Sequence, residues 1–155
     1  MCTHNSRRSH FGQIWAAVAA DYYGIENVIT YSGGTEATAL HENAIYTLLS
    51  VGFDLIAEDD TENSKYTFLF GKNKSTVCFS KTYDSPENPK ENFAAIMMCS
   101  DAEDNCPFIP GVDLRIATTY DDPKNFDRTD LQTEKYAQRC SQIARECLFM
   151  FSLVD

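Results

Sequence analysis

Cys2, Arg8 and Ser9 form a motif at the start of the chain, with five residues between the cysteine and the arginine. Five residues allow the backbone to curl so that successive N–H groups point inward at one tetrahedral anion. An amphipathic pattern follows and predicts a helix over residues 6–22. Because a helix N-terminus carries partial positive charge, loop and helix together predict a binding site for phosphate or arsenate.

The residue types of this loop also suit covalent chemistry on the anion. Arg8 can place two N–H donors on the anion's oxygens, and the same positive charge favours a nucleophilic thiolate on Cys2. Ser9 can donate a further hydrogen bond to that sulfur. Cys2 and Arg8 are therefore the predicted catalytic residues of the loop. The residues predicted to bind the anion are the others in it: Thr3, His4, Asn5, Ser6, Arg7 and Ser9.

Strand and helix patterns alternate along the rest of the chain. We expect a strand over residues 28–31, a helix after His41, a β-hairpin of residues 66–70 and 76–80, strands over residues 93–98 and 114–118, and a closing helix over residues 129–151. This order predicts one α/β domain over residues 1–155, a doubly wound parallel sheet with the hairpin as an inserted element. In such sheets, ligands bind beyond the carboxyl ends of the strands.

Only Met1 precedes Cys2, whereas this topology calls for a hydrophobic first strand in the middle of the sheet that delivers the loop. We therefore expect a sheet that lacks its first strand, in an N-terminally truncated chain. The loss would leave neighbouring strands unpaired and the loop tethered on one side only.

Composition excludes several classes of partner. The formal net charge of -10 argues against binding to nucleic acid or to anionic membrane surfaces. The chain is 43% hydrophobic, without an apolar run of membrane-spanning length and without a signal peptide. We therefore expect a cytoplasmic protein that binds an anionic small molecule through a local positive site.

The six cysteines are expected to be reduced, because a cytosolic chain of this size needs no disulfide bonds to fold. Cys140 and Cys147 lie on one helical face, and Cys78 lies in a β-rich run, so we interpret all three as core residues. No two cysteines are separated by the two to four residues typical of zinc ligands, and we predict no metal site.

Two further motifs leave their roles open. Cys99 and Cys106 lie seven residues apart around an acidic, turn-rich segment, and they are either a redox pair joined by a mobile loop or two buried thiols. Asp122 precedes Pro123, which makes it either a turn residue or a carboxyl group able to protonate a leaving oxygen. His10, on the first helix, is expected to be solvated or to cap that helix.

Together these motifs resemble the thioredoxin-coupled arsenate reductases, which have the low-molecular-weight protein tyrosine phosphatase fold. The resemblance is carried by residues 2–9, 31–34, 99–107 and 121–123. It implies that Cys2 attacks arsenate, Arg8 stabilises the charge and Asp122 acts as general acid. It also implies that Cys99 and Cys106 complete the reduction through a disulfide cascade. It further implies that no cofactor is bound and that a thioredoxin-like protein supplies the electrons.

Two other functions stay open at this point. The chain is a phosphatase if Cys2 forms a phosphocysteine that water hydrolyses, and it is an inactive oxyanion-binding remnant if the chemistry is lost. Several positions differ from the reductase pattern. His4 replaces a glycine, Arg7 replaces a cysteine and adds charge at the mouth of the loop, and Gln13 replaces a cation-binding glutamate. Tyr120 lacks the aromatic context usual before the Asp-Asp-Pro sequence.

Overall fold

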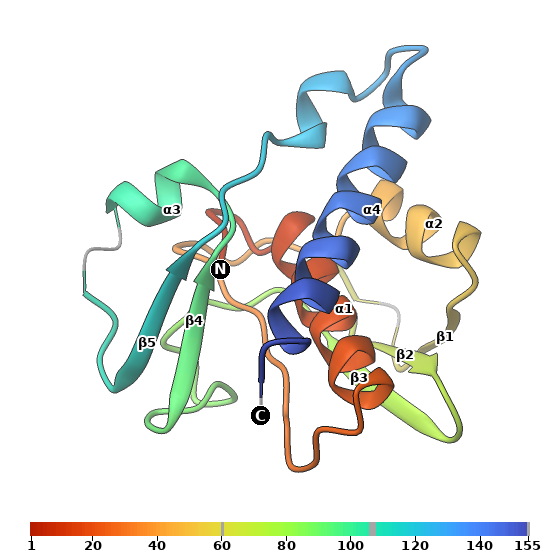
Figure 1. Ribbon diagram of the computed structural model, residues 1–155. Coiled ribbons are helices and arrows are strands. Elements are labelled where there is room, and N and C mark those ends of the chain that lie inside the picture. Colours follow the sequence, from red (N-terminus) through yellow and green to blue (C-terminus); the bar gives the residue numbers. More distant parts are fainter. Residues whose placement is uncertain (60, 106–107, 155) are drawn as a thin grey trace.

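The computed structural model describes residues 1–59, 61–105 and 108–154 (Figure 1). Its elements in chain order are α1 (Arg8–Tyr22), α2 (Glu42–Ser50), β1 (Asp54–Ala57), β2 (Tyr66–Phe70), β3 (Lys74–Cys78), β4 (Phe93–Met97), α3 (Ser100–Asn105), β5 (Val112–Ala117), the 3-10 helix η1 (Pro123–Phe126) and α4 (Gln132–Phe151). The long predicted helices and the hairpin are therefore confirmed. None of the helices in the described part of the chain is both long and apolar enough to cross a membrane.

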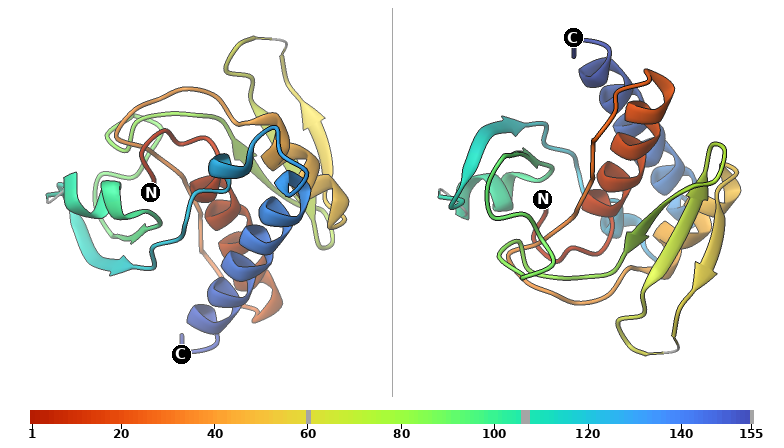
Figure 2. Two further views of the ribbon diagram at one scale, coloured as in Figure 1. Left: turned by 90° about the horizontal axis from the view of Figure 1, so that it is seen from above. Right: turned by 90° about the horizontal axis from the view of Figure 1, so that it is seen from below.

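The strands form two sheets on opposite sides of α1 (Figure 2). β1, β2 and β3 make an antiparallel sheet, and β4 pairs with β5 in parallel. The hairpin turn between β2 and β3 has Gly71 and Asn73 at positive φ, which glycine and asparagine adopt more readily than other residues. β1 was not predicted, because its short sequence runs into a polar stretch that gives no strand signal.

Met1 and Cys2 lie between β4 and the segment that contains Gly33 and Gly34. The Met1 amino group donates to the Ile96 carbonyl, and the Met98 N–H donates to the Met1 carbonyl at 2.7 Å. On the other side, the Cys2 N–H donates to the Gly33 carbonyl at 3.3 Å, and Cys2 and Gly34 form a parallel bridge. The loop that follows Cys2 therefore starts at the carboxyl end of β4, as expected for a ligand site in a parallel sheet.

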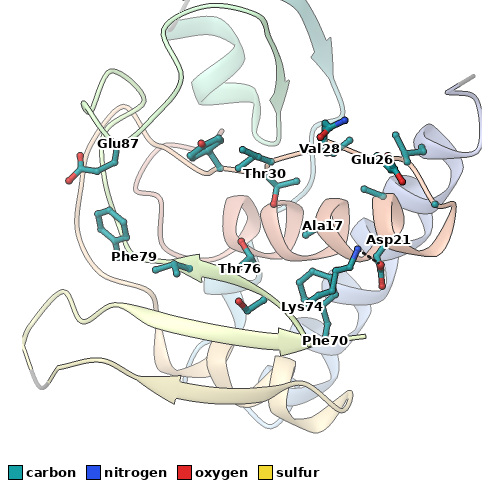
Figure 3. Close-up of a pocket in the computed structure, with 18 of the residues that line it drawn as sticks. Ala17, Asp21, Glu26, Val28, Thr30, Phe70, Lys74, Thr76, Phe79 and Glu87 are labelled. Carbon is teal, nitrogen blue, oxygen red and sulfur yellow. Dashed lines mark ion pairs between the residues drawn. The ribbon is translucent and has the colours of Figure 1, made fainter. Parts of the chain in front are cut away.

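Residues 28–31 form no strand, contrary to the prediction. A strand needs a neighbour for its backbone N–H and C=O groups, and bridges are formed only further along, where Gly34 meets Cys2 on one side and Thr82 on the other. A cavity of about 740 Å³ lies between this segment, α1 and β3 (Figure 3). A second cavity of about 510 Å³ lies between this segment and β4. Neither cavity contains Cys2 or Arg8 in its lining.

The main core joins α1 and α4 to the antiparallel sheet. Phe11 and Ile14 of α1, Phe68 of β2 and Ile143 of α4 are fully buried there. A smaller cluster beside β4 contains Cys2, Met97, Cys99, Ala102 and Ile109. The anion loop thus lies where these two apolar clusters meet.

The predicted core cysteines are confirmed as buried. Burial raises the pKa of Cys78 and of Cys147 to about 12, and that of Cys140 to about 11. Because the thiolate is the reactive form, these three thiols are poor nucleophiles in the folded protein.

We therefore predict that iodoacetamide modifies none of Cys78, Cys140 and Cys147 at pH 8 in the folded chain, and modifies all three once the chain is unfolded in urea. Peptide mass spectrometry of alkylated protein measures this directly. Modification of these cysteines at the same rate with and without urea would contradict the core that places them.

Candidate functional site

Asn5 sets the shape of the anion loop. It is fully buried and has a φ of 44°, in the left-handed region that non-glycine residues rarely adopt. Its side chain is held on both sides, because Nδ2 donates to Ser9 Oγ at 2.8 Å and Oδ1 accepts from the Lys81 N–H at 2.8 Å. These bonds offset the cost of the left-handed conformation, so the loop is curled before any ligand binds.

The Cys2 sulfur lies at the base of this loop. The Cys2 residue is 4% exposed, and its Sγ is 3.0 Å from Ser9 Oγ. Because Ser9 Oγ already accepts a hydrogen bond from Asn5, its own hydrogen is available to donate to the sulfur. The predicted Ser9 contact is therefore present in the geometry, at the start of α1, which begins two residues later than predicted.

Arg8 and Asp122, predicted from separate motifs, are in contact. Arg8 Nη2 and Asp122 Oδ2 are 2.5 Å apart, and Arg8 Nη1 donates to the Tyr120 carbonyl at 2.5 Å. The second oxygen of Asp122 accepts from the Lys124 N–H at 3.0 Å and so caps η1. The structure therefore brings together the predicted charge-stabilising group and the predicted general acid beside the loop.

Tyr120 anchors this arrangement, a role that no pattern in the sequence indicates. Its hydroxyl donates to Glu146 of α4 at 2.5 Å, and its N–H donates to the Met98 carbonyl at 3.2 Å. Burial raises the pKa of Tyr120, so the hydroxyl stays protonated and remains a donor. The carbonyl that holds Arg8 is thereby tied to both α4 and the end of β4.

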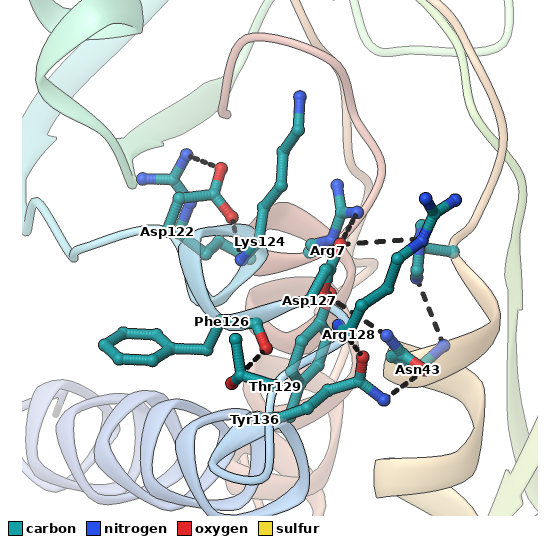
Figure 4. Close-up of polar contacts among 12 residues, drawn as sticks. Arg7, Asn43, Asp122, Lys124, Phe126, Asp127, Arg128, Thr129 and Tyr136 are labelled. Atoms are coloured by element: carbon teal, nitrogen blue, oxygen red, sulfur yellow. Dashed lines mark hydrogen bonds and ion pairs between the residues drawn. The ribbon is translucent and has the colours of Figure 1, made fainter.

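Arg7 differs most from its prediction. We expected this side chain at the mouth of the loop, but it is buried: Nε donates to Tyr136 Oη at 2.6 Å, and Nη2 pairs with Asp127 at 2.9 Å (Figure 4). The Tyr136 hydroxyl also donates to Asp127 at 2.7 Å, since burial raises the pKa of Tyr136 to about 12. The Arg7 side chain therefore ties the loop to Tyr136 of α4 and does not lie at the mouth of the loop.

The loop residues Thr3, His4 and Ser6, also predicted to bind the anion, each contact a different part of the chain. Thr3 Oγ1 is 3.5 Å from the Cys99 sulfur. The His4 side chain is exposed and lies 3.8 Å from Glu36. Ser6 is buried, and its carbonyl accepts from the His41 N–H at 3.0 Å. Thr3 thus connects the loop directly to a second cysteine.

Cys99 is buried directly after β4 and shares the smaller apolar cluster with Cys2. Its sulfur accepts a hydrogen bond from the Ala102 N–H at 3.3 Å, because residues 100–105 form the helix α3 rather than the predicted mobile loop. Cys106 lies outside the described residues, so the pairing of Cys99 with Cys106 stays a prediction.

The prediction for His10, a solvated or capping residue, was also wrong. It is fully buried, and Nε2 lies 2.8 Å from the Asn5 carbonyl oxygen. Burial, followed by repulsion from Lys81, lowers the pKa of His10 to about 3 despite the hydrogen bond to Asn5. No pattern in the sequence distinguishes this histidine from a surface one.

Gln13 makes direct contacts with β3. Its Nε2 donates to Thr76 Oγ1 at 2.9 Å and to the Val77 carbonyl at 2.8 Å.

Within residues 1–59, 61–105 and 108–154, no three His, Cys, Asp or Glu side chains are grouped so that they could hold a metal ion.

Comparison with known proteins relates this site to one group of enzymes. The chain is 27% identical over 139 residues to the arsenate reductase of Bacillus subtilis strain 168, a match covering 90% of this chain and 82% of that protein. It is 29% identical over 140 residues to the arsenate reductase of Bacillus licheniformis, with the same coverage of 90% and 82%. Arsenate reductase 2 of Staphylococcus haemolyticus is 28% identical over 124 residues, or 79% of this chain and 75% of that protein. The chain resembles the arsenate reductases.

The resemblance predicted from the motifs is therefore confirmed, although no family model matches the chain. A crystal structure of arsenate reductase from Archaeoglobus fulgidus DSM 4304 matches with a TM-score of 0.62 at 15% identity, over 97% of this chain and 95% of that one. This likeness confirms the predicted α/β fold of the low-molecular-weight phosphatase type.

The backbone of the anion loop packs closely against Gly34, and this contact leads to a testable prediction. A Cβ atom there would lie 2.5 Å from the Thr3 carbonyl oxygen and 2.7 Å from the Asn5 nitrogen, and neither backbone atom can yield without moving the loop. We expect Gly34→Ala to lower turnover on the order of a hundredfold, as small misplacements of reacting groups do. Gly24→Asn is the control, because nothing lies within 4 Å of its Cβ position and asparagine tolerates the φ of +68°. Equal turnover in both variants would contradict the close packing of the loop.

A second prediction concerns pH. The unfolded chain protonates His10 near pH 6.5, whereas the folded chain does so only near pH 3. The stability that neutral His10 contributes is thus complete above about pH 6.5 and is lost progressively as the pH falls toward 3. At pH 5 the loss is about 2 kcal/mol.

Urea unfolding of the wild type and of His10→Gln at pH 7 and pH 5 measures this difference. The wild type is expected to lose about 2 kcal/mol more than the variant between the two pH values. An identical pH dependence in the two proteins would show that His10 is accessible to protons in the folded state.

Proposed function

We propose that the chain is a cysteine-dependent arsenate reductase in which Cys2 is the nucleophile. The observation that carries this proposal is the curled loop at the N-terminus of α1, with the Cys2 sulfur at its base and the Arg8–Asp122 pair beside it. The relatives named arsenate reductase support an enzyme of this type, and arsenate as its substrate.

Arsenate binds in the loop, where the backbone N–H groups and the helix N-terminus face its oxygens. Arg8 is paired with Asp122 in the structure, and its buried Nε has no partner among the described residues. A bound dianion competes with Asp122 for this guanidinium, while the Tyr120 carbonyl keeps the guanidinium near the loop. Once Arg8 turns to the anion, the Asp122 carboxyl group is released from the ion pair and is available to the reacting oxygens.

In the first chemical step, the Cys2 thiolate forms a sulfur–arsenic bond, and one arsenic–oxygen bond breaks. The departing hydroxide takes a proton from Asp122 and leaves as water. Arsenic remains in the +5 state in this covalent adduct. Loop N–H groups and Arg8 stabilise the negative charge on the remaining oxygens.

In the second step, the Cys99 thiolate attacks the Cys2 sulfur. A Cys2–Cys99 disulfide forms, the sulfur–arsenic bond breaks, and its electron pair stays on arsenic, which leaves as arsenite. The two electrons come from the two thiols. The shared apolar cluster of Cys2 and Cys99, and the Thr3 contact to the Cys99 sulfur, support this transfer.

Cys106 then attacks Cys99, releasing the Cys2 thiolate and moving the disulfide to Cys99–Cys106. A thioredoxin-like protein reduces that disulfide and restores the enzyme. We place this cycle in the cytoplasm, whose reducing thiols keep cysteines such as Cys2 and Cys99 free between turnovers.

The test separates reduction from ester hydrolysis, which needs Cys2 and Asp122 but no second thiol. We expect Cys2→Ser to abolish both arsenate reduction and hydrolysis of p-nitrophenyl phosphate. Cys99→Ser and Cys106→Ser are each expected to abolish arsenate reduction in a thioredoxin-coupled assay while leaving any ester hydrolysis intact. Cys140→Ser is the matched control, because Trp15 can donate to a serine oxygen as it does to the Cys140 sulfur.

Arsenate reduction that survives in Cys99→Ser or Cys106→Ser would overturn the cascade. Ester hydrolysis with no arsenate reduction in the wild type would instead assign the chain to the phosphatases. Loss of both activities in the wild type would leave only oxyanion binding.

A further inference from the structure

His10 is a buried polar residue that the reaction above does not use. It lies in the first turn of α1, next to Ser9, and its ring bridges two segments of the chain. Nε2 lies 2.8 Å from the Asn5 carbonyl oxygen, and Nδ1 lies 3.3 Å from Ser32 Oγ. Full burial of an imidazole with both nitrogens occupied indicates a specific hydrogen-bonding role rather than core filling.

The partners of the ring fix its tautomer. A carbonyl oxygen only accepts hydrogen bonds, so the hydrogen must lie on Nε2, and Nδ1 then accepts from the Ser32 hydroxyl. The ring stays neutral throughout the physiological range, because burial keeps its pKa near 3. His10 therefore holds the Asn5 carbonyl with a permanent neutral donor.

The Asn5 carbonyl belongs to the same peptide plane as the Ser6 N–H. In a trans peptide these two groups point in opposite directions. By holding the carbonyl on the side of α1, His10 turns the Ser6 N–H to the opposite side. The Asn5 side chain is held separately by Ser9 and Lys81, so the backbone orientation depends on a different bond from the side-chain orientation.

We propose that His10 is a positioning residue that aims the Ser6 N–H at the oxyanion bound in the loop. It touches neither the anion nor Cys2, and it acts through the Asn5–Ser6 peptide plane. This inference rests on the proposed oxyanion site, and it assigns one donor of that site to one supporting side chain.

Two variants of His10 separate this role from simple burial. The Nε2 atom of glutamine can occupy the place of the imidazole Nε2, so His10→Gln keeps a donor toward Asn5. The shorter His10→Asn reaches only the position of Nδ1, so it keeps a polar group near Ser32 and loses the bond to Asn5. Ser32→Ala is a third variant, which keeps the imidazole and removes the hydrogen bond at Nδ1 that holds the ring in its orientation toward Asn5.

The experiment titrates inorganic phosphate into the nitrogen-15-labelled full chain and follows the loop amides by NMR, with affinity from calorimetry. In the wild type, phosphate is expected to shift the amide protons of Ser6 and Arg8 downfield. In His10→Asn the Ser6 shift is lost, the Arg8 shift remains, and affinity falls roughly tenfold, as expected for one donor to a charged group. His10→Gln restores the Ser6 shift, and Ser32→Ala gives an intermediate one.

Equal Ser6 shifts in wild type and His10→Asn would overturn the positioning role while leaving the oxyanion site intact. Equal loss of all loop shifts in His10→Asn and His10→Gln would also overturn it, since burial alone would then explain the residue. Absence of any phosphate-induced shift in the wild-type loop would overturn the proposed site, and this inference with it. If His10→Asn does not fold, the Ser32→Ala result decides: a Ser6 shift as large as in the wild type overturns the proposal.

Discussion

The left-handed backbone of Asn5 is the constraint on which the rest of the site depends. A non-glycine residue in this conformation costs on the order of 1 kcal/mol, so the surroundings must hold it. Ser9 and Lys81 bind the side chain, and His10 binds the carbonyl. These contacts come from the helix and from the chain after β3, which means that the loop is shaped by elements that are themselves packed.

The charged residues around the loop form two ion pairs that differ in burial and in partners. Arg8 and Asp122 form an ion pair beside the loop, and we propose that a bound anion replaces Asp122 as the partner of Arg8. Arg7 and Asp127 form a largely buried pair that Tyr136 completes, and this pair ties the loop to α4. Removal of one member of such a pair leaves an uncompensated charge and is strongly destabilising. The two adjacent arginines are therefore held by different partners, and in our proposal only Arg8 takes part in the reaction.

Much of the fold could be predicted because its signals are local. The β2–β3 hairpin follows from two β-rich runs around a turn with Gly71 and Asn73, and α4 follows from a long helical stripe. Residues 28–31 have the same kind of β signal but form no strand, because a strand also needs a neighbour, and sequence pattern does not reveal one. β1 was missed for the opposite reason. Its sequence has no clear strand pattern, but backbone pairing with β2 holds it as a strand.

The site shows the same division. Sequence patterns identified the Cys2, Arg8 and Ser9 motif and the Asp122–Pro123 motif. The structure brings these residues together. The burial of Arg7 and His10 could not be predicted from the sequence. Arg7 is buried by partners that are distant in sequence, and His10 is buried by its contact with the curled loop.

A crystal structure of the protein with bound arsenate would test the central claim most directly. The account predicts one anion in the loop, within hydrogen-bonding distance of the N–H groups between Cys2 and Ser9, with the Arg8 guanidinium turned from Asp122 onto the anion and the Asn5 conformation unchanged. An anion bound elsewhere with the loop empty, or a loop that abandons the left-handed Asn5 to bind it, would contradict the account.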